Sequence, residues 1–270
     1  MLEITGLHKT FFPGTHNEVR ALRGVDLQID PGSWVNVIGT NGSGKSTLLN
    51  AVAGAFPVDQ GQILLDGNDI TNWPEHRRAK LIGRVFQDPF SGTAPSMTIG
   101  QNLALASRRG RFRGLGFALK SKRRDELRER VAAMGLGLED KIDKPMDTLS
   151  GGQRQSITLL MAGLVRPALL LLDEHTAALD PKSADKIIQL TEAFVSEYRL
   201  TTIMVTHSMH QAANYGDRVV MMHQGSIRHD FSGQAKKRLR AADLISKFDE
   251  LRRSDQLDDS AAEMLRSQYV

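Results

Sequence analysis

The chain has 270 residues, a net charge of +4 and no cysteine, so disulfides and thiolate metal sites are excluded. Its longest apolar run, Ala168 to Leu172, is far shorter than the roughly 20 residues that span a bilayer, and we therefore expect any membrane role to be peripheral. The modest positive charge permits anionic partners of several kinds but selects none of them.

The N-terminal part of the chain is predicted to combine short strands with one strand–loop–helix unit. Residues 2–7 and 22–29 have the composition of strands, and apolar and polar residues alternate in the second. A third strand, 33–38, runs directly into the loop 39–47. The segment that begins at Ser46 has helical spacing, and we expect it to stop at Gly54 because glycine readily ends helices.

A hairpin and a helical region are predicted next. The sequence GQILLDGNDI (61–70) indicates two short strands joined at Asp66 and Gly67. Residues from about 95 to 163 are mostly helical in character. They separate the strand–loop–helix unit from the remaining strands.

The strands resume after this region and alternate with a helix. The apolar run 168–172 predicts a strand that is buried on both faces. Asp180 is expected to cap a helix that begins at Pro181 and ends near Tyr198, before the strand 201–207. This alternation predicts an α/β fold with a parallel sheet, some antiparallel β structure and an inserted helical segment.

The loop 39–47 reads GTNGSGKST and has the pattern G-x-x-x-x-G-K-[ST]. Its glycines allow consecutive backbone N–H groups to point inward around a phosphate, at a helix N-terminus whose dipole favours anions. Lys45 would then reach the outer phosphates of a nucleotide, and the Ser46 hydroxyl would be a ligand for Mg²⁺. A flexible Gly/Ser turn is the alternative, but the strand before the loop and the helix after it favour phosphate binding.

An acidic pair, Asp173 and Glu174, follows the buried strand at its C-terminal end, where ligands gather in open α/β sheets. Asp173 could hold a metal ion through its water shell. Glu174 would then be free to orient or deprotonate a water that attacks the γ-phosphate. An ordinary acidic strand end is the alternative, and the phosphate loop favours the functional interpretation.

The segment Leu149-Ser150-Gly151-Gly152-Gln153 lies between these two sites, and this LSGGQ sequence resembles that of the nucleotide-binding domains of ABC transporters. Other similarities follow in the family's order. Gln87 in VFQDP is similar to the Q-loop, residues 178–180 to the D-loop, and His207 in MVTHS to the switch histidine. Phe11 lies where the family places an aromatic ring that stacks on adenine, with Phe12 as the competing ring.

The resemblance implies an ABC-type ATP-binding domain over residues 1–230, with a helical subdomain inserted at about 90–163, and a C-terminal helical extension over 231–270. It implies ATP and Mg²⁺ as cofactors. The catalytic residues would be Glu174, His207 and Gln87, and the metal would be held by Ser46, Gln87 and Asp173. The residues that it implies for nucleotide binding are Phe11, Gly39, Thr40, Asn41, Gly42, Ser43, Gly44, Lys45, Ser46, Thr47, Ser150, Gly151, Gly152 and Gln153.

The resemblance also implies partners. In the family, the LSGGQ segment faces the nucleotide of a second subunit, so we expect an ATP-dependent, head-to-tail homodimer. Without a fused membrane segment, the chain is expected to bind separate transmembrane permease subunits at the cytoplasmic face of the cell membrane. The loop GTNG and the run 173–180 resemble ATPases of amino-acid uptake systems, for which a solute-binding protein is a further candidate partner.

Two positions depart from the family's frequent sequence DEPTSALD. His175 replaces the proline beside the catalytic carboxylate, and Ala177 lacks a hydroxyl. Neither change removes a required charge, so we expect hydrolysis to be kept, and Glu174 is a simpler general base than His175. His207 has a structural alternative, as a histidine that is hydrogen-bonded at a strand end.

Two regions match the family less closely. Residues 108–124 carry eight basic residues and no acid, which we interpret as a solvated face in preference to a nucleic-acid or lipid site. This basic stretch is the reason to consider an alternative function, that of a soluble ABC-type ATPase that acts on nucleic acid or ribosomes. Such relatives generally carry two nucleotide domains or long coiled coils, so nucleic acid is not an expected partner. Near the C-terminus, a helix is predicted to pack an apolar face onto the domain through Leu244, Ile245, Phe248 and Leu251.

Overall fold

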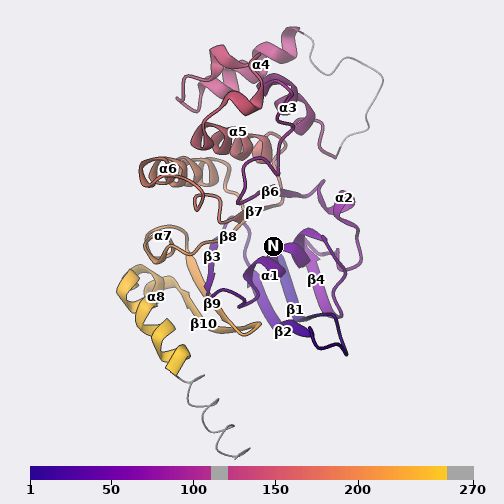
Figure 1. Cartoon of the computed structure of the whole chain (residues 1–270), viewed down its shortest axis with the longest axis vertical. Helices are drawn as coiled ribbons and strands as arrows, with labels where there is room; N and C mark the ends of the chain where they lie inside the picture. The colour runs from indigo at the N-terminus through magenta and orange to yellow at the C-terminus, as the bar shows by residue number, and fades with distance from the viewer. Residues whose placement is uncertain (111–120, 254–270) are drawn as a thin grey trace, which may run out of the picture.

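The computed structural model describes residues 1–110 and 121–253. Two sheets occupy the lower part of the molecule in Figure 1, and a group of helices from the middle of the chain forms its upper end. The strands are β1 (Leu2–Phe11), β2 (Val19–Ile29), β3 (Trp34–Gly39), β4 (Gln60–Leu65), β5 (Asn68–Asp69), β6 (Ile82–Val85), β7 (Leu169–Asp173), β8 (Thr202–Val205), β9 (Arg218–His223) and β10 (Ser226–Ser232). The helices are α1 (Lys45–Ala53), α2 (Glu75–Arg78), α3 (Ile99–Ala106), α4 (Ser121–Ala132), α5 (Gly151–Gly163), α6 (Pro181–Tyr198), α7 (Met209–Asn214) and α8 (Gly233–Arg238), with 3₁₀ turns at Glu139–Lys141 and Met146–Thr148.

The larger sheet has the strand order β10-β9-β3-β8-β7-β6 and is parallel except where β10 pairs with β9. The four leucines of β7 are fully buried, which confirms the prediction of a strand covered on both faces. Because the strands β3, β7 and β8 are parallel neighbours, their carboxyl ends meet at one edge of the sheet. The loop 39–47, the acidic pair and His207 follow these three ends.

The smaller sheet is antiparallel, with the order β2-β1-β4-β5. The predicted hairpin is confirmed, since Asp66 and Gly67 both have positive φ (49° and 76°) between β4 and β5. The first strand is longer than predicted and reaches Phe11, because its pairing with β2 continues to Val19 through register shifts. One apolar core joins both sheets and helix α1, so this helix is held on several sides.

The helical region between β6 and β7 has its own apolar core. Ile99 and Leu103 from α3, Leu127 and Val131 from α4, and Ile157 from α5 are buried together. Helix α5 also packs closely on α6, and this contact connects the helical region to the parallel sheet. The prediction of helical structure in this part of the chain is confirmed.

The C-terminal part contains α8 and a further helix over residues 241–253. Leu244 and Phe248 are buried against β9 and α7, and Leu251 is partly buried there, as predicted. The prediction for Ile245 is wrong, because its side chain is 51% exposed. Each residue advances about 100° around a helix, so Leu244, Phe248 and Leu251 lie on one side, whereas Ile245 lies roughly 90° from the centre of that side.

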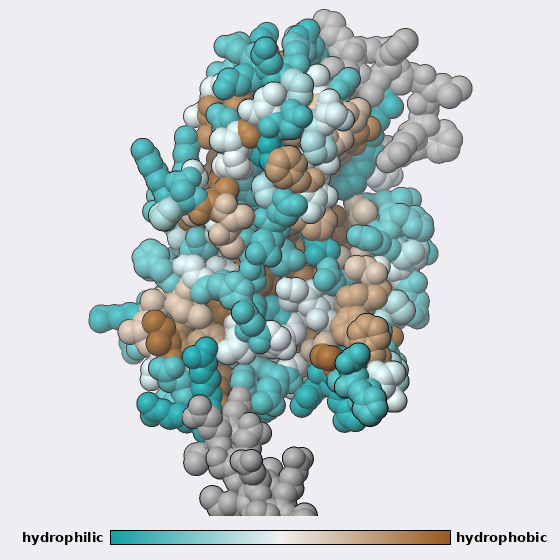
Figure 2. All heavy atoms as spheres, viewed as in Figure 1, coloured by the Kyte–Doolittle hydropathy of each residue, from teal (hydrophilic) through white to brown (hydrophobic). Residues whose placement is uncertain are grey.

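No helix of the described residues is long and apolar enough to cross a membrane. On the face drawn in Figure 2, hydrophilic residues predominate and hydrophobic residues gather in separate small areas. Most of the basic stretch 108–124 lies outside the described residues, including Phe112 and Phe117.

Candidate active site

The loop 39–47 joins β3 to α1, as predicted, and a Cβ at Gly39 or Gly44 would approach neighbouring atoms too closely. A Cβ on Gly39 would lie 2.3 Å from Ser43 Oγ and 2.5 Å from the Met222 carbonyl oxygen. Gly44 has φ +100° and is the N-cap residue of α1 without any side-chain cap. The N–H groups of the first turn of α1 therefore have no side-chain acceptor from the cap, an arrangement that suits an anion.

Lys45 is buried at the centre of this loop. Its Nζ donates hydrogen bonds to the carbonyl oxygens of Gly39 (2.9 Å) and Thr40 (3.0 Å). Burial lowers the pKa of the Lys45 ammonium, while the nearby carboxylates of Glu174 and Asp173 raise it. Helix α1 packs on β7, so the loop and the acidic pair are neighbours in space.

Two hydroxyl groups of the loop fit a nucleotide with its metal ion. Ser43 Oγ is buried and has no hydrogen-bond partner among the described residues, so a phosphate oxygen would satisfy it. Ser46 is exposed at the start of α1. With the carboxylate of Asp173, it supplies the oxygen donors that Mg²⁺ prefers.

Glu174 and His207 are in direct contact. Glu174 Oε1 lies 2.6 Å from His207 Nε2, with the glutamate side chain 10% exposed and the histidine side chain 45% exposed. Glu174 has φ +46°, a left-handed conformation that is uncommon for a residue other than glycine, and its N–H donates to the Val205 carbonyl oxygen (3.0 Å). The end of β8 thus holds the backbone that presents this carboxylate to the histidine.

Asp173 has a partner that sequence reasoning missed. Its Oδ2 lies 3.2 Å from Nη2 of Arg84, which comes from β6. The sequence signal is weak, because an arginine inside the short strand before Gln87 belongs to no motif. Only the pairing of β6 with β7 brings the two side chains together.

Ser150 and Gln153 form a capping box at the N-terminus of α5. Ser150 Oγ accepts a hydrogen bond from the Gln153 N–H (3.3 Å), and Gln153 Oε1 accepts one from the Ser150 N–H (3.2 Å). No hydrogen bond or ion pair joins the described residues 150–153 to the loop 39–47. Figure 1 shows α5 among the upper helices and α1 beside the sheets, so the LSGGQ segment and the phosphate loop belong to different parts of the chain.

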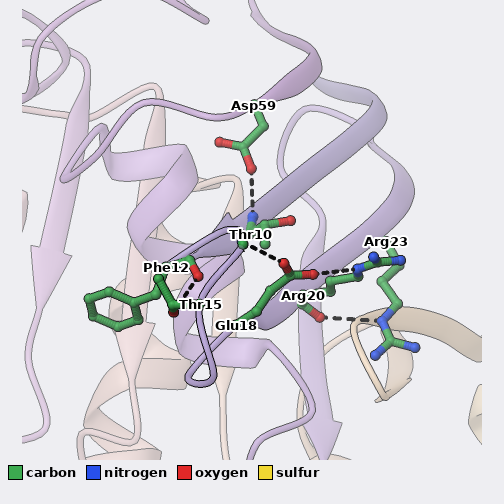
Figure 3. Close-up of polar contacts among 8 residues, drawn as sticks. Thr10, Phe12, Thr15, Glu18, Arg20, Arg23 and Asp59 are labelled. Carbon is green, nitrogen blue, oxygen red and sulfur yellow. Dashed lines mark hydrogen bonds and ion pairs between the residues drawn. The ribbon is translucent and has the colours of Figure 1, made fainter.

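Among the described residues, no hydrogen bond or ring contact joins Gln87, Phe11 or Phe12 to the loop 39–47 or to the acidic pair. Gln87 is exposed after β6 and makes no hydrogen bond within the described residues. The Phe11 ring packs edge-on against Phe56, with ring centroids 5.2 Å apart, whereas Phe12 is 65% exposed and has φ +52°. Figure 3 shows the Phe12 ring directed away from the polar groups around it, while Thr15 Oγ1 donates to the Phe12 carbonyl oxygen (2.8 Å).

His175 is 2% exposed and its imidazole contacts α6. Its Nε2 lies 3.0 Å from Thr191 Oγ1 of α6, and burial lowers its pKa to about 4. The D-loop that follows leads to Asp180, whose side chain caps α6 by accepting from the Ser183 N–H (3.0 Å). His175 is thus a structural residue, which leaves Glu174 as the carboxylate in contact with His207.

Comparison with known proteins agrees with this geometry. The family model for ABC transporters matches residues 22–177. This chain belongs to the ABC transporter ATP-binding family. A tyrosine transport ATP-binding protein of Clostridioides difficile is 42% identical over 92% of this chain and 99% of its own length. An energy-coupling factor transporter ATP-binding protein of Acetivibrio thermocellus is 32% identical over 84% of this chain and 78% of its own length.

The fold of an ABC ATPase is confirmed by solved structures. A dimeric ATP-binding cassette bound to ADP and Pi superimposes with a TM-score of 0.74 at 28% identity, covering 86% of this chain and 98% of that one. As a member of this family, the chain is an ATPase. The nucleotide-binding interpretation of the sequence is therefore confirmed at the level of the family.

Proposed function

We propose that this chain powers the uptake of an amino acid or a similar small solute by hydrolysing ATP beneath separately encoded permease subunits. The observation that carries the proposal is the Glu174–His207 contact of 2.6 Å beside Lys45 and the phosphate loop. A carboxylate and an imidazole held together at the mouth of a phosphate cradle suit the activation of water for attack on a γ-phosphate.

The roles of the residues follow from their positions. The loop residues 39–47 bind the phosphates, Lys45 neutralises their charge, and Glu174 orients or deprotonates the attacking water. His207 contacts Glu174 and would hold its carboxylate in place. Ser46, Asp173 and Gln87 would hold Mg²⁺, which when bound neutralises charge on the transferring phosphate. Phe11 would stack on adenine, with the exposed Phe12 as the alternative ring.

The separation of the LSGGQ segment from the phosphate loop supports a homodimer. Ser150, Gly151 and Gly152 are at the open N-terminus of α5, where a phosphate of another chain's nucleotide would be accepted. Two chains arranged head to tail would then each complete the other's site. ATP would favour this closed dimer, because only the dimer contacts the nucleotide from both sides.

A groove beside Gln87 supports the proposed membrane partner. It has a volume of about 840 Å³ and lies between the parallel sheet and the helical region. Its lining includes Phe86, Asp88 and Pro89 from the Gln87 loop, together with Leu105, which is 45% exposed. A permease segment docked here would touch the loop that carries Gln87, so that docking and hydrolysis are linked. The chain would then act at the cytoplasmic face of the membrane.

Uptake of an amino acid is supported by the relatives, which include the tyrosine transport protein and methionine import ATP-binding proteins of Corynebacterium. A solute-binding protein would deliver the solute to the permease. The alternative of a nucleic-acid or ribosome ATPase is not favoured by these relatives. Its starting point, the basic stretch 108–124, lies mostly outside the described residues.

Glu174→Gln tests the mechanism. The variant is expected to bind ATP, to lose at least about 100-fold in turnover because general-base catalysis is removed, and to accumulate as an ATP-dependent dimer. Turnover is measured by phosphate release and the dimer by gel filtration with light scattering, with and without permease subunits in membranes. Asp185→Asn, on the exposed surface of α6, is the matched carboxylate-to-amide control. Normal turnover by a monomeric Glu174→Gln protein would rule out the assignment.

A further inference from the structure

Arg84 joins three elements of the site although it belongs to no sequence motif. Its Nη2 lies 2.7 Å from Asn50 Oδ1 of α1 and 3.2 Å from Asp173 Oδ2 of β7. The side chains of Arg84 and Asp173 are each 14% exposed, so solvent screens this ion pair only weakly. The guanidinium carbon lies 4.5 Å from the Phe86 ring centroid, and this ring supports the guanidinium from one side.

The charges around Asp173 indicate what the Arg84 cation contributes. Lys45 also interacts electrostatically with Asp173 and Glu174. If Arg84 were absent, Lys45 would be a cation available to the Asp173 carboxylate, and a pair between them would withdraw Lys45 from a phosphate. The contact with Arg84 uses Oδ2 of Asp173, which leaves Oδ1 for another ligand.

We propose that Arg84 is a positioning residue that fixes the Asp173 carboxylate, through Asn50 and the phosphate-loop helix, in the orientation that receives the metal of a bound nucleotide. This inference rests on the proposed nucleotide function and adds a residue to it. Partners that orient a metal-binding carboxylate typically contribute 10–100-fold to metal affinity. The contribution would be visible in binding as well as in turnover.

Arg84→Met tests the proposal, because methionine keeps much of the stem and removes the charge. The affinity for a non-hydrolysable ATP analogue is measured by calorimetry in EDTA and again with Mg²⁺. We expect the variant to bind the analogue in EDTA as tightly as the parent chain, and to bind it about tenfold more weakly with Mg²⁺. Arg84→Lys keeps a positive charge without the planar guanidinium group. Its affinity for the analogue with Mg²⁺ should fall between those of the parent chain and Arg84→Met.

Arg109→Met is the matched control, since Arg109 is also a half-buried arginine in the wall of the same groove. It donates to the backbone carbonyl oxygens of Ala162 (2.9 Å) and Val165, and it has no carboxylate partner among the described residues. We expect this variant to bind the analogue normally with Mg²⁺, even if its melting temperature falls.

The outcomes separate the two proposals. Unchanged affinity with Mg²⁺ in Arg84→Met, or equal weakening with and without Mg²⁺, would overturn the positioning role. If Arg84→Met does not fold, the same comparison on Arg84→Lys decides, and affinity equal to the parent chain would again overturn it. Failure of the parent chain itself to bind the analogue would instead contradict the proposed function.

Discussion

At the scale of single residues, His175 replaces a proline that is frequent in the family, and the substitution has a clear structural consequence. The imidazole is buried and lies 3.0 Å from Thr191 Oγ1, which in turn donates to the Ile187 carbonyl oxygen (2.8 Å). A side-chain contact therefore ties the residue after Glu174 to the middle of α6. The backbone of Glu174 is in an uncommon conformation, and this contact helps to hold it.

The burial of His175 predicts a pH dependence of stability. Its pKa is lowered by burial from 6.5 to about 4, so the unfolded chain binds a proton at a higher pH than the folded chain does. Stability is therefore fully present above pH 6.5 and is lost as the pH falls toward 4, by about 3 kcal/mol from this group. Urea unfolding in EDTA at pH 7 and pH 4.5 measures the loss.

His175→Gln is the variant for this comparison, because glutamine keeps a polar side chain that does not titrate. It should be less stable than the parent chain at pH 7, and its stability should depend less steeply on pH between 6.5 and 4.5. Identical pH profiles for the two proteins would show that His175 is not buried in its neutral form.

At the scale of elements, helix α1 depends at its C-terminal end on a residue from another element. Gly54 ends the helix with φ +81°, and a Cβ there would lie 2.7 Å from Arg78 Nε. Arg78 is fully buried and donates to the carbonyl oxygens of Ala51 (2.7 Å) and Val52 (2.9 Å) in the last turn. The helix that presents the phosphate loop is thus anchored at its far end by one arginine from α2.

Replacing Arg78 with leucine should destabilise the chain by about 3 kcal/mol, because buried carbonyl oxygens at the end of α1 lose their donors. The shift in the urea midpoint measures this change. Arg77→Leu is the control, since Arg77 is exposed and stacks on Trp73 at 3.7 Å, a contact worth less than about 1 kcal/mol at the surface. Equal losses in the two variants would contradict the anchoring role of Arg78.

At the scale of the whole molecule, the phosphate loop and the LSGGQ segment are on separate parts of the chain, which is the physical reason for proposing a dimer. Helix α5 begins in the helical region, whereas the loop is at the edge of the parallel sheet. In the proposed dimer, a nucleotide bound in the loop of one chain would meet the LSGGQ segment of the other chain.

Ser150→Arg should prevent the ATP-dependent dimer without weakening ATP binding to one chain, because a large cation would occupy the proposed interface. Light scattering of the double variant Glu174→Gln, Ser150→Arg measures the dimer, and calorimetry measures ATP binding. Thr98→Arg is the matched control, because Thr98 forms the same capping box with Gln101 at the start of α3. A persistent dimer in the Ser150 variant would place the interface elsewhere.

The local structure was predictable from the sequence alone. Local sequence signals indicated the loop 39–47, the end of α1 at Gly54, the hairpin at Asp66 and Gly67, and the start of α6 after Asp180, and each prediction was confirmed. The site residues were proposed from motifs for the same reason, since each motif is a short segment with its own chemistry. Their individual roles stay predictions.

Only the tertiary structure decided which side chains touch across the fold. The contacts of Arg84 with Asp173, of Arg78 with the end of α1 and of His175 with Thr191 join residues that are 16 or more positions apart in sequence. Such pairs follow from strand order and helix packing, which no local pattern encodes. The exposure of Ile245 has the same origin, because the side of a helix that is buried depends on what lies beside it.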